Sequence, residues 1–171
     1  MKFLTCYAPL SIVLSWSLLA SGQLTFEILG DLPGGGNQSY AKAVSADGSV
    51  IAGDSMSDRG YEVFKWADNV FTPGGDLPGG SFTSWANDIS SNGSTIVGIG
   101  TTDIGTQAFV WTNTGMANLE DLIGVGYIAA NGVSADGSVI VGEGPSGAFR
   151  LEGASVTLLE IPAQSAKDVS T

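Results

Sequence analysis

The sequence predicts an all-β protein built from a repeat of four-stranded antiparallel units, arranged as an incomplete β-propeller-like array. Three observations favour this fold class. Long segments recur at a fixed spacing, Gly and Pro interrupt the chain about every ten residues, and no segment shows sustained helical periodicity. A β-sandwich and a β-solenoid are the alternative architectures. Solenoid coils are usually shorter than the unit found here, which counts against the second alternative.

Two motifs define the repeat. Residues 30–35 read Gly-Asp-Leu-Pro-Gly-Gly, and the same letters return at 75–80. Residues 44–53 read Val-Ser-Ala-Asp-Gly-Ser-Val-Ile-Ala-Gly, and this segment returns with substitutions at 89–98 and 133–142. Matching positions of the first two units lie 45 residues apart, whereas the third unit is shortened to 40.

Each unit is predicted to form four short strands, which in the first unit cover 40–45, 49–53, 62–66 and 70–72. An Asp-Gly step joins the first two strands, because Asp tolerates positive φ and Gly favours it. Leu-Pro-Gly-Gly closes the unit as a turn. The second strands, such as Val50-Ile51, are apolar on both faces, which places them between layers. A four-stranded unit buried on both faces matches a propeller blade.

The predicted organisation is a secretory signal peptide followed by a repeat array. Lys2, an apolar run and Ala20-Ser21-Gly22 form the signal pattern, with a retained anchor as the alternative. The predicted segments are 1–22 (signal peptide), 24–29 (a lone leading strand), 30–74, 75–120 and 121–159 (three units of 23–171), and 160–171 (a partial fourth unit). Since a ring needs at least four blades, we expect a truncated array, or one completed by other subunits.

Composition excludes several function classes. The chain has 17 Asp and Glu against 6 Lys and Arg, a net charge of −11, which argues against nucleic acid and against anionic membrane surfaces as partners. The chain has no His, and Cys6 lies in the predicted signal. A Ser-His-Asp nucleophile and a His/Cys zinc site are therefore excluded, and no metal or other cofactor is predicted.

The repeats resemble the HAF family of probable extracellular repeat proteins. The matching segments are the two motifs described above, at 30–36, 44–53, 75–80, 89–98 and 133–142. The family's His-Ala-Phe triplet is altered: Glu62-Val63-Phe64, Gln107-Ala108-Phe109 and Gly147-Ala148-Phe149 keep the Phe and lack the His. The resemblance implies export and a repeat scaffold, and it implies no known reaction.

Five residues are candidates for a binding site. Asp47, Asn92 and Asp136 occupy the same turn in successive units, where they could contribute to a cation or sugar site or simply make the hairpin turn. No unit has the alternating oxygen ligands of a calcium loop. Tyr40 and Trp85 share a repeat position beside the Pro-Gly-Gly loop and are predicted to offer exposed aromatic contacts.

The remaining recurrent side chains are interpreted as structural. We expect the aromatic residues of the third strands to wedge between units rather than stack on sugars; these are Phe64, Trp66, Phe109 and Trp111. The acids before the Leu-Pro turn, or its remnant in the third unit, are predicted to accept backbone hydrogen bonds; these are Asp31, Asp76 and Asp121.

The sequence thus predicts a secreted, periplasmic or surface-exposed binding or structural module that is not an enzyme. Its ligand is unknown, with a glycan or a protein as the expected classes, and open strand edges are expected to permit self-association. One alternative is a carboxylate-dependent carbohydrate-active enzyme, which needs two carboxylates about 5 to 10 Å apart. Another is a truncated fragment of a longer repeat protein with no function alone. The unbroken repeat pattern shows no position that looks catalytic.

Overall fold

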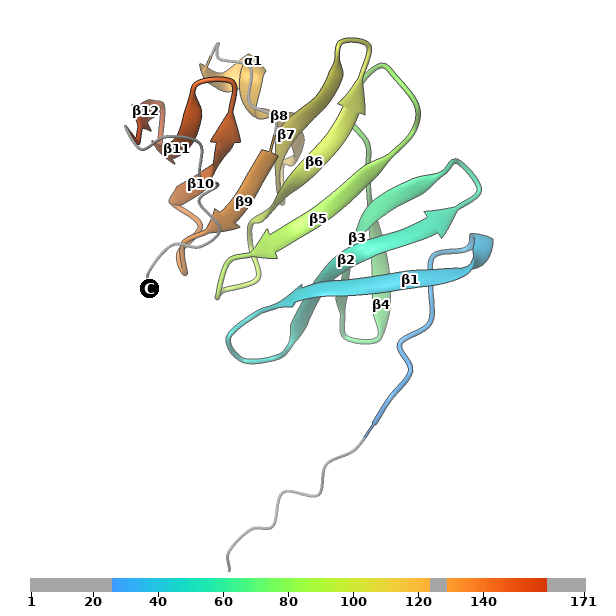
Figure 1. Ribbon diagram of the computed structural model, residues 1–171. Helices are drawn as coiled ribbons and strands as arrows, with labels where there is room; N and C mark the ends of the chain where they lie inside the picture. Colours follow the sequence, from blue (N-terminus) through green and yellow to red (C-terminus); the bar gives the residue numbers. More distant parts are fainter. Residues whose placement is uncertain (1–25, 124–128, 160–171) are drawn as a thin grey trace, which may run out of the picture.

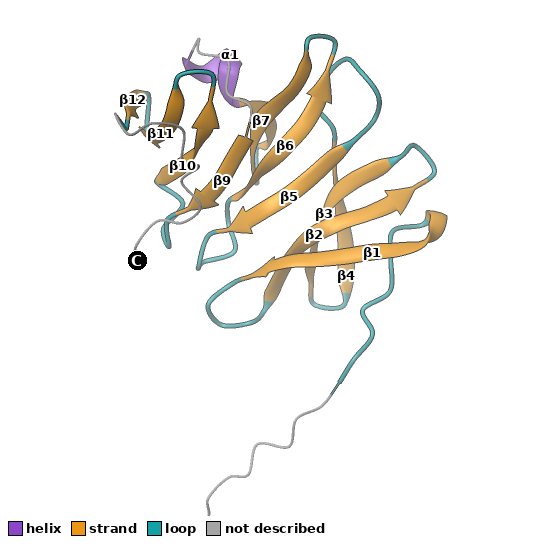
Figure 2. Cartoon of the chain, viewed as in Figure 1, coloured by secondary structure: helices purple, strands orange, loops and turns teal. Residues whose placement is uncertain are grey.

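The computed structural model describes residues 26–123 and 129–159, which form strands and one short helix (Figure 2). Three four-stranded antiparallel sheets follow one another along the chain, each with its strands in sequence order. Figure 1 shows the first sheet at the lower right and the third at the upper left. The predicted all-β repeat of four-stranded units is confirmed. No helix in these residues is long and apolar enough to cross a membrane.

Each sheet comes from one unit of the repeat. The first sheet contains β1 (Gly34–Val44), β2 (Val50–Ser57), β3 (Tyr61–Ala67) and β4 (Val70–Gly75). The second contains β5 (Ser84–Ile89), β6 (Ile96–Thr102), β7 (Gly105–Thr112) and β8 (Gly115–Asn118). The third contains β9 (Ala129–Val133), β10 (Val139–Gly144), β11 (Gly147–Glu152) and β12 (Ser155–Leu158).

Two elements differ from the prediction. The lone leading strand at 24–29 is wrong for its described part, since residues 26–29 form no strand. A strand needs a hydrogen-bonding neighbour, and no strand of the described chain pairs with this segment. A helix, α1 (Leu119–Ile123), replaces the third Leu-Pro turn and includes Asp121. Asn118 Oδ1 accepts a hydrogen bond of 3.0 Å from the amide of Glu120, which stabilises the start of this helix. The predicted signal peptide and partial fourth unit lie outside the described residues.

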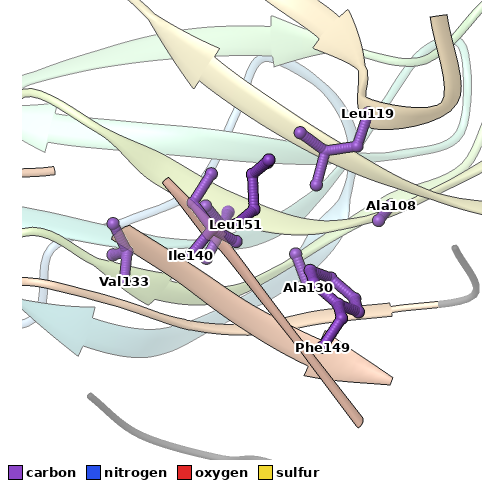
Figure 3. Close-up of a cluster of buried hydrophobic side chains, with 8 residues drawn as sticks. Ala108, Leu119, Ala130, Val133, Ile140, Phe149 and Leu151 are labelled. Carbon is purple, nitrogen blue, oxygen red and sulfur yellow. The ribbon is translucent and has the colours of Figure 1, made fainter. Parts of the chain in front are cut away.

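The hydrophobic core lies between successive sheets. One cluster joins the first two sheets and consists of Ala52, Val63, Leu77, Ala86, Ile89, Ile96 and Phe109. The second joins the next two and includes Val97, Ala108, Leu119, Ala130, Val133, Ile140, Phe149 and Leu151 (Figure 3). Phe109 and Trp111 pack at the first of these contacts, which agrees with their prediction as wedges. Phe64 is equally buried but packs on Phe71 of its own sheet, with ring centroids 4.8 Å apart.

A β-bulge recurs between the first and second strands of every sheet. In the first sheet Ala41 pairs with Gly53 and Ala43 with Ala52, so that Lys42 is the extra, unpaired residue. The same shift of register leaves Asn87 and Asn131 unpaired in the other two sheets. Bulges bend a strand and redirect one side chain. Each unit therefore presents one side chain, at a matching position, that the strand pairing does not constrain.

Candidate functional site

The Asp-Gly turns are held together by their own side chains. Asp47 Oδ1 accepts hydrogen bonds from Ser45 Oγ (2.7 Å), Ser49 N (3.0 Å) and Ser49 Oγ (2.8 Å). Asn92 Oδ1 and Asp136 Oδ1 accept the same three bonds in their own units. Hydrogen bonds to the ionised form lower the pKa of Asp47 to about 2, with the Ser45 hydroxyl as the largest cause. The geometry supports the hairpin interpretation of these residues.

The three turns lie side by side at one end of the array (Figure 1). Ala46 N donates to Ser91 O over 3.0 Å, and Asn92 N donates to Ala135 O over 3.3 Å, which links each turn to the next. The structure thus brings the sequence-predicted turn residues into one row. In each of these residues Oδ1 already accepts hydrogen bonds within its own turn. The row of turns therefore helps to hold neighbouring sheets together.

The two candidate aromatic residues differ in their surroundings. Tyr40 lies on β1 with 50% of its surface exposed, opposite Asp54 of β2. Trp85 lies at the matching place on β5, is half-buried, and stands opposite Ile99. Tyr40 is therefore an exposed aromatic ring beside a carboxylate, whereas Trp85 is a half-buried ring beside an aliphatic side chain.

Asp54 is the most unusual side chain near Tyr40. It is 2% exposed, and its Oδ1 accepts no hydrogen bond from the described part of the chain. Burial raises the pKa of this carboxyl group, and the nearby ammonium group of Lys42 partly opposes that rise. Burying a carboxylate oxygen without a donor is unfavourable, which makes this residue a candidate for a role beyond folding.

The bulge residue Lys42 stands between Tyr40 and Asp54. Its Nζ lies 3.7 Å from Asp54 Oδ1, which is the separation of an ion pair rather than of a hydrogen bond. The same atom lies 5.6 Å from the centroid of the Tyr40 ring, within the range of a cation–π contact. The side chain of Lys42 remains 42% exposed, so its ammonium group can also reach a ligand in solvent.

Tyr61 completes the group. Tyr61 lies on β3, two residues before Val63, which pairs with Asp54, so Tyr61 and Asp54 share one face of the sheet. The Tyr61 hydroxyl donates a hydrogen bond to Gln38 Oε1. Burial raises the pKa of Tyr61, and the neighbouring Tyr40 and Asp54 raise it further. We call Tyr40, Lys42, Asp54 and Tyr61 the first-sheet cluster.

The first-sheet cluster differs from the second sheet at all four positions, whereas the third sheet keeps an acid, Glu143, at the Asp54 position. The matching residues of the second sheet are Trp85, Asn87, Ile99 and Thr106. Asn87 uses its bulge position differently, since its Nδ2 donates to Ala130 O of the third sheet over 2.8 Å. Sequence reasoning identified Tyr40 as a candidate but did not identify Lys42, Asp54 or Tyr61. A position-by-position comparison of the units, with the bulge included, would have identified them.

Two other acids, the buried Glu62 and the half-buried Asp76, serve the scaffold. Glu62 is 1% exposed, accepts two hydrogen bonds from Arg59 Nη2 (3.2 and 3.1 Å), and accepts one from Gly75 N (3.0 Å). Asp76 Oδ2 accepts from Thr83 N over 2.7 Å, as predicted for a backbone acceptor. Burial raises the pKa of Asp76, whose Oδ1 lacks a partner among the described residues. Asp76 recurs as Asp31 in the repeat, whereas the Asp54 position holds Ile99 in the second sheet and Glu143 in the third.

Acidic side chains also line an open hollow of about 380 Å³ beside α1, and its lining includes Asp103, Glu120 and Asp121. Asp103 Oδ1 already accepts a hydrogen bond of 3.0 Å from Gly80 N. Across residues 26–123 and 129–159, no three Asp or Glu side chains are grouped closely enough to hold a metal ion. These acids therefore contribute to the negative surface of the protein.

Comparison with models of known protein families found no match to this chain, and no curated protein matched it. The internal repeats and the geometry of the first-sheet cluster are therefore the basis for assigning a function.

Proposed function

We propose that this protein is a secreted or surface-exposed β-repeat binding module, and that the first-sheet cluster binds a glycan. The observation on which the proposal rests is the burial of the Asp54 carboxylate. At the position where the second sheet has Ile99, the first sheet holds a buried carboxylate, one oxygen of which accepts no hydrogen bond from the described residues and has the Lys42 ammonium group 3.7 Å away. A repeat scaffold does not need that group, because the second sheet folds in the same way without it.

The chemistry of the cluster suits a sugar ring. A carboxylate is purely an acceptor, and the buried Asp54 acts on a ligand through Lys42, whose partly exposed ammonium group lies 3.7 Å from Asp54 Oδ1. The open ring of Tyr40 offers an apolar surface on which the C–H groups of a sugar can pack. The ammonium group of Lys42 and the hydroxyl of Tyr61 are donors for the ring and hydroxyl oxygens of the same ligand.

Two features of the sequence support an extracellular setting. The pattern of residues 1–22 is typical of a secretory signal, and the repeats resemble the HAF family of probable extracellular proteins. The net charge of −11 suits a neutral glycan better than an acidic one, because an anionic polymer would be repelled by the protein as a whole.

The experiment is a screen of neutral oligosaccharides against the purified protein, followed by calorimetric titration of the sugars that bind. Tyr40→Ala and Asp54→Asn should each weaken binding about tenfold or more. Glu143→Gln is the matched control, because Glu143 occupies the position of Asp54 in the third sheet, opposite Ala129 rather than an aromatic residue. Its affinity should equal that of the wild type.

Two results would contradict the proposal. The first is a set of bound sugars whose affinity is unchanged in both cluster variants. The second is turnover of a polysaccharide that Asp54→Asn abolishes, which would favour the carboxylate-dependent enzyme.

A further inference from the structure

The aromatic side chain that packs between the first two sheets is missing from the second contact. Trp111 of β7 packs on the cluster that joins the first and second sheets. The same position is held by Trp66 in the first unit and by Leu151 in the third, and in every unit it pairs with an Ile of the second strand. The contact between the second and third sheets therefore has a Leu where the preceding contact has an indole ring.

A second position changes together with the first. Gly74 of β4 lies against the Trp111 ring, since a Cβ on this glycine would be 3.0 Å from the ring atoms Cε3 and Cζ3. The glycine thus leaves the space that the ring occupies. Leu119 stands at the matching position of the second unit, 45 residues further along the chain. Two Leu side chains, Leu119 and Leu151, therefore replace a glycine and a Trp ring.

The two Leu side chains do not fill the contact. An open hollow of about 360 Å³ remains there, and its lining includes Leu119, Leu151, Val110 and Ile140. Figure 3 shows Leu119, Ile140 and Leu151 in this region, and they are 0%, 6% and 4% exposed. The hollow lies where the preceding contact has its ring, because the Leu151–Ile140 pair corresponds to the Trp–Ile pair there.

The lining indicates the kind of molecule that fits. An apolar cavity stays dry, and one of roughly 150 Å³ is enough to admit benzene. A planar apolar ring would restore the contacts that a Trp ring makes in the preceding contact. Among the described residues that line the hollow, Glu152 alone is charged, and its Oε2 lies 2.9 Å from Arg150 Nη2. A carboxylate ligand is disfavoured by this acid and by the net charge of −11.

The surroundings of the hollow favour a small molecule over a protein segment. Gly137, Ser138 and Gly153 form the rest of its described lining. None of the large exposed apolar side chains of the described chain lines the hollow. A stable protein–protein contact buries on the order of 1,200 Å² or more, with an apolar centre. The hollow has no such surface around it.

We propose that this hollow is a second binding site, which takes a neutral aromatic molecule about the size of indole in the place of the missing Trp side chain. The site belongs to the second and third sheets, whereas the first-sheet cluster belongs to the first. The two sites therefore bind their ligands independently. A molecule that binds only the folded protein stabilises it, so indole should also raise the melting temperature.

Titration of the purified full chain with indole tests the proposal. Calorimetry measures the affinity, and methyl NMR locates the site. The methyl resonances of Leu119, Ile140 and Leu151 should shift, because a bound aromatic ring changes the local magnetic field. Those of Ile104, which is 75% exposed and outside the lining, should not. Indoleacetate, the anionic probe, should bind at least about tenfold more weakly than indole.

A filled hollow provides the critical variant. Leu151→Trp combined with Leu119→Gly copies the preceding contact, so it should abolish indole binding. The matched control is Val70→Trp, which adds the same side chain at a position on β4 that is 58% exposed. This control should bind indole like the wild type. Binding of neutral oligosaccharides should be the same in both variants, so the outcome is separate from that of the first-sheet cluster.

Several outcomes would overturn the proposal. A wild type that does not bind indole would do so, and so would equal affinity for indoleacetate. Binding that the filled variant retains, or methyl shifts confined to residues outside the lining, would place the site elsewhere. Circular dichroism of the filled variant is the folding check. If it does not fold, Val110→Phe, which narrows the hollow from β7, should still weaken indole binding.

Discussion

The Nζ atom of Lys42 lies 3.7 Å from Oδ1 of Asp54, a buried oxygen that accepts no hydrogen bond from the described residues. Lys42 is a bulge residue whose side chain is 42% exposed, whereas the side chain of Asp54 is 3% exposed. The ammonium group compensates the buried charge only in part, because the pKa of Asp54 remains above its ordinary value. The pair combines the cost of burying a carboxylate with an ammonium group that remains available to a ligand.

Asp54→Asn should stabilise the protein at neutral pH by about 1 kcal/mol, because it removes a poorly compensated buried charge. A carboxyl group with a raised pKa binds its proton more tightly in the folded state, so its contribution to stability falls as the pH rises above 3.8. The variant should lack this fall. Thermal melts from acidic to neutral pH measure it, and lower stability of the variant at neutral pH would contradict the expectation.

Asp136 tests the turn that recurs in each unit. Asp136→Ala removes three hydrogen-bond acceptor contacts and should lower the melting temperature by a few degrees. Asp136→Asn should be close to neutral at pH 7, because Asn92 makes the same bonds in the second unit. Hydrogen bonds, above all that from Ser134, lower the pKa of Asp136 to about 2.

The same turn predicts a pH dependence at the acidic end. A lowered pKa gives stability that is present above pH 3.8 and is lost as the pH falls through about 2. Asp136→Asn should therefore lose less stability than the wild type on acidification through this range. Acid titrations followed by circular dichroism measure the difference, and parallel curves would count against this role of the carboxylate.

Arg59 and Glu62 should behave as a coupled pair. Arg59→Met leaves the Glu62 carboxylate, 1% exposed, without its cation and should destabilise the fold by about 2 kcal/mol. Glu62→Gln keeps an acceptor for Gly75 and should cost less, as Gln107 occupies the same position in the second sheet. Urea unfolding of the single and double variants gives the coupling, and additive losses would contradict it.

Gly98 should not tolerate a side chain. A Cβ there would collide with the carbonyl oxygen of Trp85 and would lie 2.9 Å from the ring of Phe109. Gly98→Ala should therefore cost about 3 kcal/mol, the upper end for overpacking. Gly36→Ala is the matched control, because a Cβ there meets no heavy atom of the described chain within 4 Å. If chemical denaturation gives equal stabilities for the two variants, this close approach of the strands is not a constraint.

The sequence allowed much of the fold to be predicted, because the same turn and strand motifs occur in successive units. Asp-Gly steps at matching places determined the turns, and the recurrent Phe of the third strands identified buried positions. Strand lengths were less predictable: β1 begins at Gly34, whereas Tyr40 was the expected start. The additional residues at the start of β1 belong to the strand because they pair with β2. Local composition does not predict that pairing.

The first-sheet cluster was less accessible to sequence reasoning. Tyr40 was recognised, but its neighbours come from three strands, and their proximity depends on the register between them. The bulge at Lys42 shifts that register by one residue, so a simple alternation pattern assigns the wrong neighbours across β1 and β2. The strand predicted at 24–29 was wrong over residues 26–29 for a related reason, since a segment of strand-like composition forms a strand only where a partner strand is available.

The bulge that recurs in each sheet has a consequence for how such a protein can change over time. Its extra residue is Lys42 in one unit and Asn in the other two, while the surrounding pairing is the same. Gene duplication of a unit would therefore copy a position that can mutate without disturbing the sheet. One unit can acquire a new side chain at this position while the other units keep the same fold. A repeat of this kind can therefore evolve new binding specificities.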